Sequence, residues 1–153
     1  MKIRPHLKEF LSALSPLYEI VIFTASASAY AKTIINYIDK EKKHINAILS
    51  REHCMETKNG FYIKDLRIIK ERDLKDMIIV DNLVHSFGFQ IENGVPILEF
   101  INDKKDEELK HLKEYLLEAH KHDDLRAFNK KVLKLHDFAN KNIDEIFHKL
   151  GGF

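Results

Sequence analysis

Polar residues follow two apolar runs that we interpret as buried strands. Thr24 comes directly after residues 20–23, and Asp81 and Asn82 follow residues 77–80. Neither run alternates between apolar and polar residues, which is typical of strands covered on both faces in a parallel α/β sheet. Ligands of such sheets bind in the crevice at the carboxyl ends of the strands. The sequence therefore predicts a ligand site that contains both Thr24 and Asp81.

Each candidate also has a purely structural interpretation. Taken alone, Thr24 more often just ends a strand, and Lys64 would be a solvated surface lysine. For Asp81 the functional and the structural interpretation are equally open. The pair His120 and His122 has no cysteine partners, so a polar helix break explains it better than a metal site. The sequence has no Gly-x-x-x-x-Gly-Lys loop and no Gly-x-Ser-x-Gly elbow, which argues against a P-loop nucleotide-binding protein and a serine hydrolase.

Composition limits the class of protein. The 153 residues are 44% hydrophobic and 32% charged, as in a folded domain. A net charge of +1 creates no field that would attract nucleic acid or an anionic membrane. Cys54 is the single cysteine, which fits a reducing compartment. Since no apolar run approaches the ~20 residues of a membrane helix, we expect an intracellular protein, nuclear or cytoplasmic, without nucleic-acid or membrane partners. Its oligomeric state stays open.

The remaining pattern predicts the elements that must position these residues. Apolar spacing predicts helices over residues 5–14 and 27–38, strands over 18–24, 45–49, 77–80 and 95–98, and a helix that contains Leu109, Leu112 and Leu116. Asn59-Gly60 predicts a type I′ turn in an inserted β-hairpin. Phe87, Phe89 and Ile91 should be buried although they lie in a loop.

The end of the chain predicts one amphipathic helix. Leu125, Phe128, Val132 and Leu135 recur at spacings of three and four, and Gly151-Gly152 supplies a stop. We expect residues 125–150 to form a single helix docked through these four side chains. The predicted division is therefore a domain over residues 1–124 and a C-terminal helical segment over residues 125–153.

Five motifs, jointly specific, occur in the order in which a known family carries them. They are Arg4-Pro5-x-Leu7 with Phe10-Leu11, residues 18–26, Tyr62-Ile63-Lys64-Asp65-Leu66, Ile79-Val80-Asp81-Asn82, and Glu92-Asn93-Gly94-Val95-Pro96-Ile97. Over about residues 3–124 the chain resembles the small C-terminal-domain phosphatases, the NLI-interacting-factor-like branch of the haloacid dehalogenase (HAD) superfamily. The resemblance implies an α/β, HAD-like Rossmannoid parallel sheet with an inserted β-hairpin and C-terminal helices.

The resemblance also implies a function and a role for each site residue. It implies a Mg²⁺-dependent protein serine/threonine phosphatase that acts on a phosphoprotein or phosphopeptide through an aspartate nucleophile. In this chain Thr24 would hydrogen-bond the phosphoryl oxygens, and Lys64 would neutralise their charge and hold the aspartyl-phosphate. Asp81 would ligate Mg²⁺, and Asn82 would help to fix that site. These roles agree with phosphoryl transfer being mostly positioning and electrostatic stabilisation.

Two departures from the family pattern are evident. The family's nucleophile lies in an Asp-x-Asp-x-Thr motif on a strand before the first helix, whereas this chain has no Asp-x-Asp and its first aspartate is Asp39. We therefore expect the first, catalytic strand to be missing and the chain as given to be inactive, whether as a fragment, an incomplete gene model or a degenerate relative. In addition, Leu83 stands where better-known members have Ser-Pro.

Two other functions stay open. The chain could be a non-catalytic protein- or peptide-binding relative with the same fold. It could also be a solvated α/β domain whose C-terminal helix mediates assembly. Retention of Thr24, Lys64, Asp81 and Asn82 favours the phosphatase-type domain, because a pure binding module does not require them.

Overall fold

The computed structural model describes residues 2–135. Their elements alternate between helices and strands, as predicted. The helices are α1 (Leu7–Leu14), α2 (Ser28–Ile38), α3 (Glu108–Ala119) and α4 (Leu125–Leu133). The strands are β1 (Ile20–Phe23), β2 (Ile45–Leu49), β3 (Met55–Glu56), β4 (Tyr62–Ile63), β5 (Ile79–Asp81) and β6 (Gly94–Pro96), and short 3-10 segments are η1 (Arg51–His53), η2 (Leu66–Ile68), η3 (Leu74–Asp76) and η4 (Val84–Asn93).

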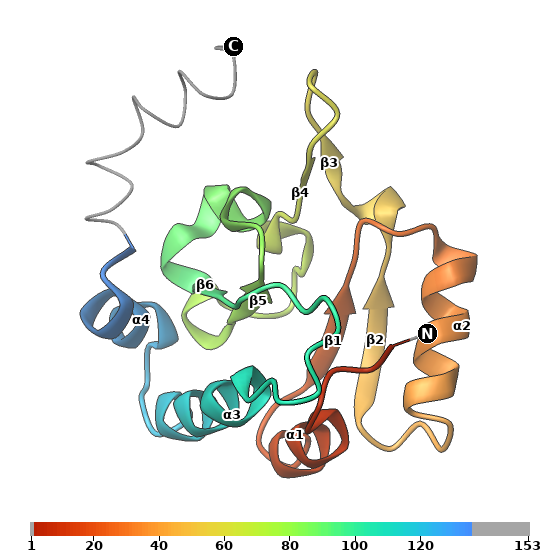
Figure 1. The fold of residues 1–153 in the computed structure, drawn as a ribbon. Helices are drawn as coiled ribbons and strands as arrows, with labels where there is room; N and C mark the ends of the chain where they lie inside the picture. The colour runs from red at the N-terminus through yellow and green to blue at the C-terminus, as the bar shows by residue number, and fades with distance from the viewer. Residues whose placement is uncertain (1, 136–153) are drawn as a thin grey trace.

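The strands form two parallel pairs and one hairpin, which confirms the α/β class. β1 pairs with β2 in parallel, with Phe23 opposite Leu49. β5 pairs with β6 in parallel, with Val80 opposite Val95. The antiparallel pair β3–β4 projects from this body (Figure 1). The sequence predicts that both 20–23 and 77–80 are covered on both faces. β5 buries Ile79 and Asp81, whereas every residue of β1 is only partly buried, so the predicted burial is wrong for β1.

Each parallel pair has one edge without a strand partner. The Thr24 amide donates to the Leu49 carbonyl over 2.8 Å, so the peptide groups of Val21 and Phe23 face away from β2. The Ile97 amide donates to the Asp81 carbonyl, which likewise turns Val80 away from β6. Among residues 2–135 no strand pairs with either of these edges. The sheet is therefore divided between β1 and β5.

Two apolar clusters form the core of the molecule. The first contains Leu14, Val95 and Leu116, and it joins α1 and α3 to β6. The second contains Leu66, Ile79 and Phe87, and it lies between β5, η2 and η4. Figure 1 shows α1 and α3 side by side at the opposite end of the molecule from the hairpin. α1 and α3 thus lie at the amino end of β1, whereas α2 runs alongside β2 (Figure 1).

The start of the chain is held by Arg4 rather than by an early helix. We predicted a helix from Pro5, but α1 begins at Leu7, after His6 with a φ of 66°. Arg4 donates to both oxygens of Asp106 over 2.8 Å and to the Leu98 carbonyl over 2.7 Å. These bonds hold Arg4 against the segment after β6, and Pro5 and His6 form a turn before α1.

The hairpin is present, but its turn differs from the predicted type I′ turn. Gly60 has a φ of 79°, whereas Asn59 is not among the residues with positive φ. The Gly60 amide donates to the Thr57 carbonyl, and the Thr57 amide donates to the Phe61 carbonyl. This is a three-residue connection with glycine in the left-handed position. The side chain of Thr57 accepts from the Phe61 amide and favours this longer loop over the two-residue turn.

The predicted C-terminal helix is wrong in its length and in one of its docking residues. α4 ends at Leu133, because Lys134 adopts a left-handed φ of 52°. Val132 is 50% exposed, while Asn129 is buried in its place. Residues 136–153, including the predicted Gly151-Gly152 stop, lie outside the described residues. The proposed boundary at residue 124 stays a prediction, although α4 packs on η3 and η4. None of the helices within residues 2–135 has the length and hydropathy that a membrane crossing requires.

The loop after β5 buries Phe87 but not Phe89. Phe87 is completely buried and Ile91 is partly buried, as predicted. Phe89 is 49% exposed, because its ring lies under the Arg67 guanidinium at 5.5 Å instead of in the core. A Cβ added to Gly94 would lie 2.1 Å from the Phe87 ring, so only glycine lets β6 approach that ring.

We predict that Gly94→Ala lowers the free energy of unfolding by about 1–3 kcal/mol, because the buried Phe87 ring must be displaced. Gly88→Ala is the matched control, since a Cβ at Gly88 meets nothing within 4 Å. It should be neutral or slightly stabilising, by less than ~1 kcal/mol. Urea denaturation followed by circular dichroism measures both. Equal stability of the two variants would contradict the packing described here.

Candidate functional site

A buried ion pair lies at the carboxyl end of β5. The Lys64 ammonium donates to one carboxylate oxygen of Asp81 over 2.5 Å, and their side chains are only 13% and 6% exposed. Lys64 immediately follows β4, and its amide donates to the Ser86 carbonyl over 2.7 Å. The interpretation of Lys64 as a solvated surface lysine is therefore wrong. The hairpin carries the lysine to a carboxylate 17 positions later in the chain.

A tight turn fixes the Asp81 carboxylate from its other side. The second carboxylate oxygen accepts from the Leu83 amide over 2.8 Å, and the Ser86 amide donates to the Leu83 carbonyl. Asp81 itself is buried, whereas Asn82 is exposed on the same turn. The turn therefore holds the carboxylate rigidly and leaves the Asn82 amide accessible to a ligand.

Thr24 occupies the corresponding position at the end of β1. Its hydroxyl oxygen accepts from the Ser26 amide over 3.1 Å, so the hydroxyl proton can still be donated to a ligand. Thr24 and Ser26 line a groove of about 360 Å³ between β1, α2 and residues 2–7. The structure thus places Thr24 and Asp81 at the carboxyl ends of their strands, where the sequence predicts them.

Cys54 connects the two parts of this region. Its thiol lies 3.7 Å from the Thr24 carbonyl and within the electrostatic influence of Lys64 and Asp81. Burial raises the pKa of the Cys54 thiol, although the Lys64 ammonium opposes this effect. The thiol is therefore protonated at neutral pH and is a poor nucleophile.

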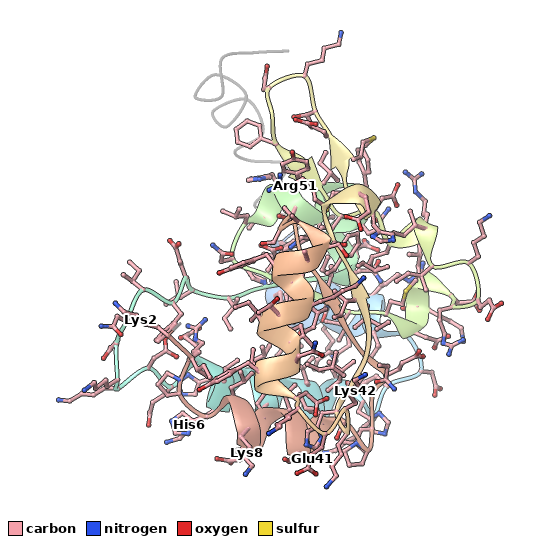
Figure 2. All side chains as sticks on the ribbon, turned by 90° about the vertical axis from the view of Figure 1, so that its right-hand side faces the viewer. Lys2, His6, Lys8, Glu41, Lys42 and Arg51 are labelled. Atoms are coloured by element: carbon pink, nitrogen blue, oxygen red, sulfur yellow. The ribbon has the colours of Figure 1, made fainter. Side chains whose placement is uncertain are left out.

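Arg51 is a candidate that the sequence analysis missed. Its side chain donates to the Ala25 carbonyl over 2.7 Å and lies over the Tyr62 ring at 5.5 Å. Figure 2 shows it at the end of α2 nearest the hairpin, with Glu41 and Lys42 at the opposite end. Its position two residues after the strand 45–49 could have identified it, because the carboxyl end of that parallel strand lies beside the end of β1.

The residues present fit a Mg²⁺ ion in part. Mg²⁺ usually takes one or two protein carboxylates and keeps several waters. Asp81 offers one carboxylate whose lone pairs are not all used by Lys64 and Leu83. The exposed amide of Asn82 adds a neutral oxygen on the same turn. Within residues 2–135 no group of three His, Cys, Asp or Glu side chains forms a complete metal site.

The Thr24 hydroxyl and the Asp81 carboxylate lie at the carboxyl ends of β1 and β5, and the Lys64 ammonium reaches Asp81 from the end of the hairpin strand β4. The ammonium and the hydroxyl can stabilise negatively charged oxygens, and the carboxylate can ligate a cation. This combination suits a phosphate-bearing ligand better than a neutral one.

Comparisons with known proteins agree with this chemistry. The model of the family described as NLI interacting factor-like phosphatase matches residues 1–126. CTD small phosphatase-like protein 3 of Caenorhabditis elegans is 43% identical over 116 residues, covering 76% of this chain and 40% of the relative. The human CTD small phosphatase-like protein is 38% identical over 138 residues, covering 90% of this chain and 47% of the relative. The chain thus spans less than half the length of these curated relatives.

A solved structure supports the fold independently. The structure of Fcp1, an essential RNA polymerase II CTD phosphatase, superposes with a TM-score of 0.66 at 21% identity. The match covers 92% of this chain and 50% of the Fcp1 chain. At this identity the likeness concerns the fold alone, and it confirms the predicted HAD-like architecture.

We predict that Lys64→Met and Asp81→Asn each lower the free energy of unfolding by about 3 kcal/mol, because each leaves a buried partner unpaired. The double variant should lose clearly less free energy of unfolding than the sum of the losses in the two single variants. The exposed pair Arg72–Glu19, with both side chains 51% exposed, is the matched control and should couple by less than ~1 kcal/mol. Urea denaturation of both double-mutant cycles tests this. Additive losses at Lys64 and Asp81 would refute a coupled buried pair.

Proposed function

Because this chain belongs to the NLI interacting factor-like phosphatase family, we propose that it forms the larger part of a Mg²⁺-dependent protein serine/threonine phosphatase domain. Its substrate would be a phosphoserine or phosphothreonine in a protein or peptide. The activity, substrates and partners of the complete protein are part of this proposal, as is an intracellular location in the nucleus or cytoplasm.

The ion pair of Lys64 and Asp81 carries the proposal. The Lys64 side chain is only 13% exposed, and an ammonium removed from water requires a negatively charged partner. A bound phosphoryl group would share the Lys64 ammonium with Asp81. Thr24 would donate its hydroxyl proton to a phosphoryl oxygen from the end of β1. Lys64 would neutralise the charge on the same group. The Ser26 amide holds the Thr24 hydroxyl, and the Asp81 carboxylate holds the Lys64 ammonium. Electrostatic stabilisation of phosphoryl transfer needs such preorganised groups.

Asp81 would hold Mg²⁺, with Asn82 helping to fix the ion. Bound there, the cation would neutralise charge on the phosphoryl oxygens. The chain's own contribution is the rigid turn in which the Leu83 amide orients the carboxylate. Lys64 would then move part of its interaction from Asp81 to the substrate.

The nucleophile is the missing component. The sequence has no Asp-x-Asp, and the edges of β1 and β5 lack strand partners among the described residues. We propose that a strand carrying the family's Asp-x-Asp-x-Thr motif pairs with both edges in the complete domain. Such a strand would satisfy the peptide groups of Val21, Phe23 and Val80 and would deliver a carboxylate between Thr24 and Asp81.

A non-catalytic protein- or peptide-binding relative is the second candidate function. The absence of Asp-x-Asp from the sequence favours it. The presence of Thr24, Lys64 and Asp81 favours the phosphatase-type domain, because a pure binding module does not require them. Adding the strand with the Asp-x-Asp-x-Thr motif distinguishes the two candidates, because only the phosphatase-type domain would gain activity.

We predict that the 153-residue chain alone does not hydrolyse p-nitrophenyl phosphate, because no carboxylate is placed to attack phosphorus. The measurement is the release of nitrophenol with and without Mg²⁺. Magnesium-dependent turnover that Asp81→Ala abolishes would show that this prediction is wrong.

We further predict that fusing an apolar strand with Asp-x-Asp-x-Thr before Lys2 raises stability and creates Mg²⁺-dependent phosphatase activity. Lys64→Ala should then lower kcat by about 10²-fold or more while Mg²⁺ binding persists. Asp81→Ala should remove metal dependence together with rate, and Thr24→Ala should also lower the rate. Tyr37→Ala, at a side chain 70% exposed on α2, is the control that should change nothing. A fusion that folds and binds Mg²⁺ but stays inert would favour the binding module.

A further inference from the structure

Gln90 is a buried polar residue in η4, outside the candidate site. It is only 7% exposed, and its backbone, with φ −130° and ψ 61°, leaves the helical conformation. Its side-chain oxygen accepts from the Leu66 amide over 3.0 Å, and its side-chain nitrogen donates to the Asp65 carboxylate over 2.9 Å. Gln90 therefore bonds the two residues that directly follow Lys64 in the chain.

The segment η4 holds the main chain on both sides of the Lys64 side chain. At Lys64 itself, the amide donates to the Ser86 carbonyl over 2.7 Å. Immediately after Lys64, the Gln90 side chain bonds residues 65 and 66. Since Ser86 and Gln90 both belong to η4, the position of the lysine main chain is set by this one segment.

The same segment also fixes the partner of Lys64. The Ser86 amide donates to the Leu83 carbonyl, and the Leu83 amide donates to the Asp81 carboxylate. A lysine side chain loses much rotamer freedom when it is held in one geometry. Movement of the main chain at Lys64 would therefore spread the ammonium over several positions and loosen its bond to Asp81.

The charge on Asp65 decides which way the Gln90 amide group points. The Asp65 carboxylate accepts from the Arg67 guanidinium over 2.6 Å, and this hydrogen bond lowers the pKa of the Asp65 carboxyl to about 2. An ionised carboxylate only accepts hydrogen bonds, and a backbone amide only donates them. The nitrogen of Gln90 must therefore face Asp65 and its oxygen must face Leu66, so only an amide side chain satisfies both.

We propose that Gln90 is a positioning residue that fixes the Lys64 ammonium where it meets Asp81 and the phosphoryl group. Gln90 acts through Asp65 and Leu66 and is not a catalytic residue. The contribution to phosphate binding rests on the proposed function, whereas the positioning of Lys64 rests on the hydrogen bonds alone.

The test compares Gln90→Met with Asn93→Leu in the ¹⁵N-labelled 153-residue chain. Asn93 is the matched control, because it is also a buried amide of η4 but donates to the carbonyls of Leu74 and Met77. Both substitutions roughly keep the side-chain volume and remove its hydrogen bonds, so both lower global stability. Only Gln90→Met should speed amide exchange at Lys64, by about tenfold beyond the change expected from global unfolding. It should also weaken the NMR signal of the Lys64 ammonium.

A reversed pair tests the contact itself. Gln90→Glu alone places a second carboxylate against Asp65, and it should loosen Lys64 at least as much as Gln90→Met does. Adding Asp65→Asn supplies an amide that donates to the carboxylate at position 90, which still accepts from the Leu66 amide. The double variant should recover most of the protection of the Lys64 amide. If Gln90→Met does not fold, this pair of variants makes the same comparison.

Titration with inorganic phosphate in the presence of Mg²⁺ connects this positioning to the proposed function. Phosphate should shift the amide signals of Thr24 and Lys64 in the unaltered chain. Gln90→Met should raise the Kd for phosphate by about three- to tenfold, because the ammonium is no longer held in place. Asn93→Leu should leave the Kd unchanged.

The outcomes are distinguishable. Equal acceleration of Lys64 exchange in Gln90→Met and Asn93→Leu, or no rescue of Gln90→Glu by Asp65→Asn, overturns the positioning role and leaves the proposed function standing. Faster exchange at Lys64 with an unchanged Kd for phosphate overturns the contribution of Gln90 to phosphate binding. No shift with phosphate in the unaltered chain overturns the proposed phosphate site, and the exchange rates then decide the positioning of Lys64.

Discussion

The ion pair between Lys64 and Asp81 is the interaction on which the site depends. It joins the inserted hairpin to the parallel pair β5–β6, two parts of the molecule that otherwise meet mainly through η4. Two charges withdrawn from water stabilise the fold only when each is well paired. The turn that carries Leu83 and Ser86 supplies the remaining hydrogen bonds, so burial of the pair is tolerated and its geometry is fixed.

The divided sheet is the second constraint. The apolar clusters around Leu14 and Phe87 pack against β6 and β5, while β1 is held by its pairing with β2 and by Ile20, which packs on the first cluster. Nothing in residues 2–135 pairs across the gap between β1 and β5. Free strand edges are liabilities in folded proteins because they pair with other strands. This property connects the stability of the chain to its proposed activity, since one added strand would serve both.

Position and specificity are separated in this architecture. The ends of β1 and β5 place Thr24 and Asp81, and regular strands hold such groups more rigidly than loops do. The exposed apolar side chains of Leu83 and Phe89 lie on the irregular segment after β5. Loops generally vary more among homologues than the strands they connect, so changes at such exposed positions would leave the proposed phosphate site in place.

The sequence by itself determined the parallel α/β class and the positions of Thr24 and Asp81, because a polar residue after an unalternated apolar run marks the carboxyl end of a buried strand. It did not determine the burial of Lys64, which depends on a partner 17 positions away. The hairpin loop, the exposed Phe89 and the end of α4 at Leu133 were likewise decided by tertiary structure. The Thr57 side chain bonds the Phe61 amide in the longer hairpin loop, and the Arg67 guanidinium lies over the Phe89 ring. The left-handed backbone of Lys134 ends α4.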